Sequence, residues 1–164
     1  MEKIAICPGS YDPITEGHKD IIIRCSKIFK KVIVAVSNNR RKKPAYSLQK
    51  RIYFVKKVLS GMEHVQVVSF DRLLVELAKE VNASVIVKGL RAISDFEYEF
   101  QMAQINKKLN PEVETIFLMT NPKYAYLSSS VIKEIAVLGG CIKGLVPPEI
   151  EHDVKESFKN NKFG

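Results

Sequence analysis

The segment from Ile4 to His18, with the sequence IAICPGSYDPITEGH, decides how the rest of the chain is organised. Its apolar start predicts a buried strand over residues 2–7, which Pro8-Gly9 is expected to end. Residues 15–18, TEGH, open a helical pattern that extends over about 17–29. A strand, a glycine-containing loop and a helix N-terminus in this order bring unpaired main-chain N–H groups and a positive helix end together. The segment therefore predicts an anion-binding site, to which the His18 side chain adds a donor.

The remainder of the chain alternates between short apolar runs and longer helical patterns. The expected strands are 2–7, 32–36, 65–68, 83–87 and 115–119. The expected helices are 17–29, 48–59, 71–81, 96–109, a helix capped by Ser128 or Ser129 that runs to 138, and 149–158. Ser47 and Asp71 are expected to cap the second and third of these. This alternation predicts an α/β fold with a Rossmann-like, doubly wound, five-stranded parallel sheet and helices on both faces.

Length and composition agree with one globular domain over residues 1–164. The chain has 164 residues, of which 46% are hydrophobic and 27% charged. The last helix is expected at about 148–158, and residues 159–164 are expected to fray. Because no apolar run approaches the ~20 residues that span a bilayer and no targeting segment is recognisable, we expect a cytoplasmic protein without membrane contact.

The net charge and the spacing of the cysteines limit the classes of function that the chain can have. Lys and Arg number 26 against 18 acidic residues, for a net charge of +8, which favours polyanionic ligands. The three cysteines lack the spacing of a zinc site, so no metal ligands are expected in the chain itself. A nucleic-acid-binding module is one alternative, but its cations should form one face interleaved with aromatic residues. Here they are spread over many helices, and we expect no nucleic-acid partner.

Polar segments follow every expected strand, at 8–18, 37–43, 69–74, 88–95 and 120–130. Parallel sheets bind ligands beyond the carboxyl ends of their strands, so these segments predict one composite site. Motifs of P-loop NTPases, dinucleotide-binding dehydrogenases and α/β-hydrolases are not found. The candidate phosphate ligands are His18, Lys42, Lys88, Arg91 and the hydroxyls of Ser10, Ser128, Ser129 and Ser130. Such a set suits phosphoryl or nucleotidyl transfer, which depends on positioning and charge neutralisation.

The segment TEGH after a strand that ends in PGSYDP resembles the T/HxGH signature of the nucleotidyltransferase superfamily. Within it, the chain resembles the bacterial phosphopantetheine adenylyltransferase family. Further segments resemble that family in the same order: Arg41-Lys42-Lys43-Pro44, Lys88 to Ala92 followed by Asp95 to Glu99, Asn121 to Tyr124, and Leu127 to Ser130. The resemblance spans residues 8–130, and its most specific part is GLRA-x-x-DFEYE together with the SSS helix start.

The resemblance implies transfer of AMP from ATP to 4′-phosphopantetheine, giving 3′-dephospho-coenzyme A and pyrophosphate. The acceptor phosphate would attack in line, with His18 as the catalytic residue that stabilises the transition state. Mg²⁺ is implied as the companion of the triphosphate. A homohexamer and feedback inhibition by coenzyme A are implied as well, although no periodicity in the sequence indicates an oligomer.

The resemblance also assigns ligand contacts. The implied ATP-binding residues are Ser10, Tyr11, His18, Gly89, Leu90, Arg91, Glu99, Tyr124, Ala125, Tyr126, Leu127, Ser128, Ser129 and Ser130. The implied phosphopantetheine-binding residues are Ser10, Lys42, Leu74 and Lys88. The family usually has arginine at position 88, threonine at 10 and phenylalanine at 11. Lys88 keeps the charge but loses the bidentate fork, Ser10 keeps the hydroxyl, and the Tyr11 hydroxyl has no assigned role.

Other activities remain open on the same scaffold. Two alternatives are a cytidylyltransferase acting on glycerol phosphate and a nicotinamide mononucleotide adenylyltransferase. The sequence of residues 89–99 argues against both. A non-catalytic nucleotide sensor is a third. Turnover of a His18→Ala variant separates the sensor from the enzymes.

Overall fold

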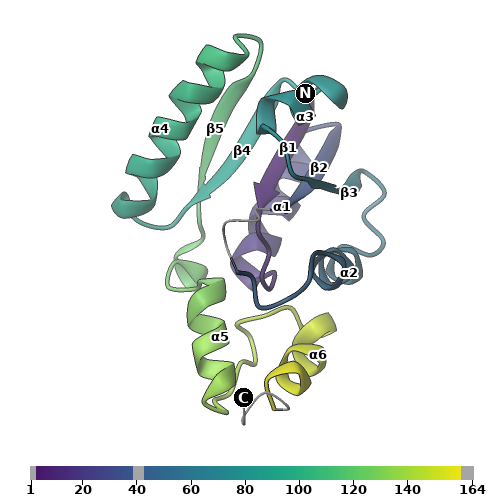
Figure 1. Cartoon of the computed structure of the whole chain (residues 1–164), viewed down its shortest axis with the longest axis vertical. Coiled ribbons are helices and arrows are strands. Elements are labelled where there is room, and N and C mark those ends of the chain that lie inside the picture. Colours follow the sequence, from purple (N-terminus) through teal and green to yellow (C-terminus); the bar gives the residue numbers. More distant parts are fainter. Residues whose placement is uncertain (1–2, 39–42, 160–164) are drawn as a thin grey trace.

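A computed structural model describes residues 3–38 and 43–159 of the chain (Figure 1). Its strands are β1 (Ile4–Gly9), β2 (Lys31–Ser37), β3 (Val65–Phe70), β4 (Val85–Leu90) and β5 (Glu114–Met119). Its α-helices are α1 (Glu16–Ile28), α2 (Leu48–Val58), α3 (Leu74–Glu80), α4 (Ile93–Leu109), α5 (Ser129–Val137) and α6 (Pro148–Lys159). A short 3₁₀ turn, η1 (Pro122–Tyr124), precedes α5. Within these described ranges no helix is long and apolar enough to cross a membrane.

The five strands form one parallel sheet in the order β3-β2-β1-β4-β5. The chain winds outward from β1 to β3 and then restarts on the other side with β4, so the switch point lies between β1 and β4. There the register pairs only Ala5 with Val85 and Ile6 with Ile86, whereas β1 pairs with β2 over six residues. Figure 1 shows α5 and α6 beyond the end toward which the strands point.

Two separate hydrophobic clusters cover the two faces of the sheet. Ala5 and Cys7 of β1 belong to the cluster formed with α1, α2, α5 and α6. Ile6, between them, belongs to the cluster that α3 completes with Leu77 and Ala78. This alternation along a strand is the period of two that a sheet imposes. The predicted doubly wound, five-stranded parallel sheet with helices on both faces is therefore confirmed.

Strands β1 to β4 all extend past their predicted carboxyl-terminal residues, and two of them do so through a predicted break. Pro8 and Gly9 were expected to end the first strand, but they pair with Ala35 and Val36 of β2. Strand β4 was expected to end before Lys88, but residues 88–90 pair with residues 117–119 of β5. In both cases pairing with a neighbouring strand outweighs the local tendency of proline or glycine to break a strand.

The helix ends were predicted more closely. Ser47 and Ser128 cap α2 and α5, and their hydroxyls accept main-chain N–H bonds from Lys50 and Val131. The predicted cap at Asp71 was wrong, because α3 begins at Leu74 with no side-chain cap at the preceding residue. The last helix continues to Lys159, and the remainder of the predicted frayed tail lies outside the described residues.

Candidate active site

His18 lies at the N-terminus of α1, where it completes the cap of the helix. The Thr15 hydroxyl accepts a hydrogen bond from the His18 main-chain N–H at 3.2 Å. In return, the Thr15 main-chain N–H donates to His18 Nδ1 at 3.1 Å. Since Nδ1 acts as the acceptor, the single ring proton of a neutral imidazole lies on Nε2. The cap therefore fixes the tautomer and leaves an Nε2–H donor for a ligand.

The surroundings of His18 keep the ring neutral. Burial, as the largest cause, together with the positive charges of Arg91 and Lys88 lowers the pKa of His18 to about 4. These two cations therefore lie within electrostatic reach of the imidazole. The edge of the Tyr11 ring also meets the imidazole, with 5.1 Å between ring centroids. At neutral pH the site presents an uncharged donor beside two positive charges.

Tyr11 closes the first loop over β1. It has a positive φ of 48°, and its buried hydroxyl donates to the Cys7 carbonyl oxygen at 2.8 Å. Burial raises the pKa of Tyr11 well above its usual value, so the phenol stays protonated. A Cβ on Gly9 would lie 2.9 Å from the Tyr11 ring, so only glycine leaves room for it. The hydroxyl that had no assigned role thus ties the loop to its own strand.

Lys88 and Arg91 are held by acidic residues of α4. Lys88 Nζ lies 3.0 Å from Glu99 Oε1. Arg91 makes a two-pronged contact with Asp95, at 3.0 and 3.1 Å, and donates from its other nitrogen to the Leu127 carbonyl oxygen at 2.8 Å. Arg91 therefore links the end of β4 to the segment before α5, across the carboxyl end of the sheet.

The N-terminus of α5 lies against the first loop. The Ser129 hydroxyl donates to the Pro13 carbonyl oxygen at 2.8 Å. A Cβ on Gly17 would lie 3.5 Å from Tyr124 Cβ, so η1 also contacts the start of α1. Two helix N-termini, those of α1 and α5, thus lie together near His18. The N-terminus of a helix carries partial positive charge, which favours a bound anion.

The other predicted site residues vary in exposure. Leu90 and Leu127 are buried, Tyr124 and Ala125 are half-buried, and Tyr126 and Ser130 are exposed. Leu74 is half-buried and packs against the hydrophobic cluster around α3. Gly89 leaves room for Ile21, which a Cβ would meet at 3.0 Å. Lys42 lies outside the described residues. The described residues converge at the end of the sheet, and their ligand contacts stay predictions.

Two residues that hold these loops together were not predicted from the sequence. Arg51 of α2 is buried and donates to main-chain carbonyl oxygens of three separate segments. Lys133 of α5 pairs with the buried Asp12 at 2.8 Å. Both are basic residues within helices, where such side chains usually face solvent, so only their tertiary contacts distinguish them.

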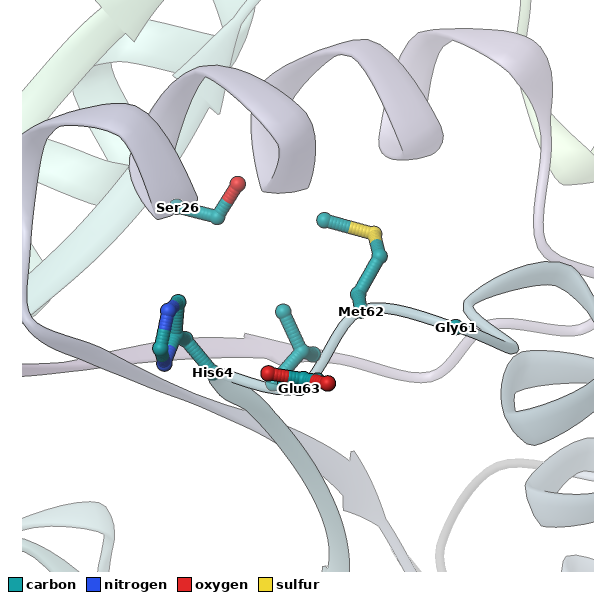
Figure 2. Close-up of a pocket in the computed structure, with 6 residues that line it drawn as sticks. Ser26, Gly61, Met62, Glu63 and His64 are labelled. Carbon is teal, nitrogen blue, oxygen red and sulfur yellow. The ribbon is translucent and has the colours of Figure 1, made fainter.

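Two hollows lie elsewhere on the described surface, at the amino end of the sheet. One, of about 280 Å³, is lined by Ser26 of α1 and residues 61–65, and Figure 2 shows Ser26 facing Met62 and His64. The other, of about 500 Å³, is lined by residues 63–66 with Ile4, Lys30 and Lys31. The Ser26 hydroxyl is already used, because it donates to the Ile23 carbonyl oxygen. No predicted site residue lines either hollow, so we place the site at the opposite end.

Comparisons with known proteins agree with a nucleotide-transfer site. Residues 6–135 match the family described as cytidylyltransferase-like. A phosphopantetheine adenylyltransferase of Caldanaerobacter subterraneus is 58% identical over 97% of this chain and 99% of its own length. A phosphopantetheine adenylyltransferase of Clostridium tetani is 56% identical over 96% of this chain and 98% of its own length. The same fold occurs in a crystal structure of a provisionally assigned nicotinate-nucleotide adenylyltransferase from Vibrio parahaemolyticus, with a TM-score of 0.72. The two sequences are 21% identical, and the match covers 99% of this chain and 94% of the other.

Proposed function

The chain belongs to the phosphopantetheine adenylyltransferase family, within the cytidylyltransferase-like proteins, and we propose that it transfers the adenylyl group of ATP to 4′-phosphopantetheine. The products are 3′-dephospho-coenzyme A and pyrophosphate, in the biosynthesis of coenzyme A. The observation that carries this proposal is the neutral His18 imidazole, fixed as an Nε2–H donor at a helix N-terminus within reach of Lys88 and Arg91.

The reaction proceeds by direct in-line displacement. A phosphate oxygen of the acceptor forms a bond to the α-phosphorus of ATP while the bond to the oxygen that bridges to the β-phosphate breaks, and pyrophosphate leaves. His18 donates from Nε2 to the α-phosphate, where negative charge is concentrated in the transition state. One such preorganised donor typically contributes about 2.7–4 kcal/mol to lowering the barrier. A neutral donor provides this without giving up its proton.

Acceptor binding is assigned to Ser10, Lys42, Leu74 and Lys88. Support comes from the position of Ser10 directly after β1 and of Lys88 near the end of β4, on either side of the switch point. The salt bridge with Glu99 holds Lys88 in this position. Leu74 is half-buried at the start of α3 and contacts the pantetheine arm.

ATP binding is assigned to the first loop, the end of β4 and the start of α5. The residues are Ser10, Tyr11, His18, Gly89, Leu90, Arg91, Glu99, Tyr124, Ala125, Tyr126, Leu127, Ser128, Ser129 and Ser130. Support comes from the contact of Arg91 with Leu127 and of Ser129 with Pro13, which join these segments. The N-terminus of α5 receives the β- and γ-phosphates.

Magnesium accompanies the triphosphate in this proposal. Mg²⁺ usually keeps several waters and binds through substrate phosphates rather than an all-protein cage. Among the described residues no three or more His, Cys, Asp or Glu side chains gather into a metal site. The phosphates and waters therefore supply its ligands, and the ion neutralises charge on ATP.

A homohexamer inhibited by coenzyme A is the proposed working form. Helix α4 lies beside the edge strand β5 (Figure 1). It carries several exposed apolar side chains. These are Phe96, Tyr98, Phe100, Ile105 and Leu109, each 40–63% exposed. Patches of this kind often mark subunit contacts. Sedimentation analysis of the wild type and an Ile105→Lys variant tests the oligomer, and cell fractionation tests the expected cytoplasmic location.

One experiment decides the function. The protein is incubated with ATP or CTP and with 4′-phosphopantetheine, glycerol phosphate or nicotinamide mononucleotide, and pyrophosphate release is measured. Release is expected only with ATP and 4′-phosphopantetheine. A preference for CTP, or for another acceptor, would contradict the proposal.

A further inference from the structure

Arg51 is a buried cation that joins three segments around the candidate site. It lies in the first turn of α2 and is 2% exposed. One terminal nitrogen donates to the carbonyl oxygens of Ser10 at 2.7 Å and Ser37 at 2.8 Å. The Nε atom donates to the Tyr46 carbonyl oxygen at 3.2 Å. A single guanidinium therefore connects the loop after β1, the end of β2 and the turn before α2.

The charge of Arg51 is not paired directly. Within residues 3–38 and 43–159 no carboxylate lies within ion-pair distance of the guanidinium. Asp12 is the negative group that acts on it from nearby, and it opposes the effect of burial, which lowers the pKa of Arg51. A buried charge with only main-chain oxygens as partners is costly to keep, so the loops that it joins are expected to need it.

Asp12 reinforces the same junction from the other side. Its two carboxylate oxygens accept main-chain N–H bonds from Ala45 and Tyr46, both at 2.9 Å. Arg51 therefore donates a hydrogen bond to the Tyr46 carbonyl oxygen, while Asp12 accepts one from the Tyr46 N–H. The segment before α2 is fixed at both polar groups of one residue, and the loop that carries Ser10 is fixed with it.

The nucleotide half of the site has separate supports. Arg91 joins the end of β4 to Leu127, and Ser129 joins α5 to Pro13. Arg51 makes no hydrogen bond to any of these four residues within the described chain. Loss of Arg51 is therefore expected to loosen the acceptor half without loosening the ATP half to the same degree.

We propose that Arg51 is the positioning residue of the acceptor-phosphate half of the site. By fixing the Ser10 carbonyl against Ser37 and Tyr46, it sets the place of the Ser10 hydroxyl and N–H, and it adds a fixed positive charge beneath the loop. This inference rests on the proposed function. It concerns positioning, since the guanidinium acts through Ser10 and contacts no reacting atom.

Steady-state kinetics of an Arg51→Lys variant test the inference. Lysine keeps the charge but cannot span three carbonyls in fixed directions. We expect the KM for 4′-phosphopantetheine to rise at least about tenfold, as small displacements of positioning groups commonly cost that much. The KM for ATP should rise less, because Ser10 is one of four assigned acceptor contacts but only one of fourteen assigned ATP contacts. Arg24→Lys is the matched control, because Arg24 is also helical and bonds a main-chain carbonyl, that of Met119. It should leave both constants unchanged.

Equal rises in both KM values would indicate a purely structural role and overturn the inference, as would no change in either. If Arg51→Lys does not fold, amide hydrogen exchange of the wild type decides. Acceptor alone should slow exchange in peptides covering residues 43–51, and ATP alone should not; no slowing by acceptor would contradict the inference. A wild type that releases no pyrophosphate would instead contradict the proposed function.

Discussion

His18 and Thr15 hold each other at the start of α1 through two reciprocal hydrogen bonds, from Thr15 N–H to His18 Nδ1 and from His18 N–H to the Thr15 hydroxyl. In most capping boxes the third helical residue is Glu or Gln. Here an imidazole takes that place, so one ring both caps the start of the helix and presents a donor to the site. Changes at position 18 must therefore separate the two roles.

Two variants at His18 achieve this separation. His18→Ala removes the ring half of the cap and the side-chain donor, while the main-chain N–H at position 18 can still bond the Thr15 hydroxyl. His18→Gln keeps an acceptor suited to the capping box but replaces the Nε2–H donor with an amide N–H in another position. Both are expected to lose turnover by roughly 10²–10³-fold, because neither places an N–H donor where His18 Nε2 lies, while ATP binding is largely kept. Pyrophosphate release and calorimetric ATP titration measure this. Unchanged turnover in either variant would remove His18 from the mechanism.

The low pKa of His18 predicts a definite pH dependence. Its folded value of about 4 lies below the usual 6.5, so the unfolded chain takes up this proton first as pH falls. Stability from the neutral ring is fully present above pH 6.5 and is lost as pH falls through 4. Histidine NMR should show a neutral His18 with its proton on Nε2 at pH 5.5, identified by the signal missing in His18→Gln. Titration of that signal near 6.5 would contradict this.

Lys88→Arg tests the lysine at position 88, where the family resemblance leads us to expect arginine. Arginine restores a bidentate fork toward the acceptor phosphate and still satisfies Glu99. We expect the dissociation constant for 4′-phosphopantetheine to fall by up to about tenfold, which corresponds to about 1.4 kcal/mol. Lys88→Met should raise it. Calorimetry measures both, and weaker binding by the arginine variant would show that Lys88 is adapted to its place.

Tyr11→Phe tests the hydroxyl that ties the first loop to β1. The variant leaves the Cys7 carbonyl oxygen without its side-chain donor, because the bond of 2.8 Å is lost. The free energy of unfolding should fall by about 1 kcal/mol, the usual net value of such a bond. Urea unfolding provides the measurement. No loss of stability would mean that water replaces the hydroxyl without cost.

Arg91→Lys tests the nucleotide half. Lysine cannot keep the two-pronged contact with Asp95 and the bond to Leu127 at once. The KM for ATP should rise by about tenfold, equivalent to about 1.4 kcal/mol, while that for the acceptor changes less. Arg24→Lys, which alters a similar Asp20 and carbonyl contact on α1, provides the control. A larger effect on the acceptor would contradict the division of the site into two halves.

The sequence determined the strand–loop–helix start, the five strands and the placement of polar segments after each of them. These follow from short-range patterns, because apolar periodicity and helix caps act over a few neighbouring residues. The helix caps at Ser47 and Ser128 were predictable for that reason, and so was the meeting of His18, Lys88 and Arg91 at one end of a parallel sheet.

Only the tertiary structure decided where the strands end and what holds the loops. Because β1 pairs with β2, it continues through Pro8, where the local sequence alone predicts that the strand ends. The neutral state of His18 depends on burial and on charges at least seventy residues away in the chain. The sequence around Arg51 predicts only an ordinary arginine in a helix. Its contacts with Ser10, Ser37 and Tyr46 exist only in the folded structure. Desolvation and long-range pairing depend on the whole fold, so no local pattern encodes them.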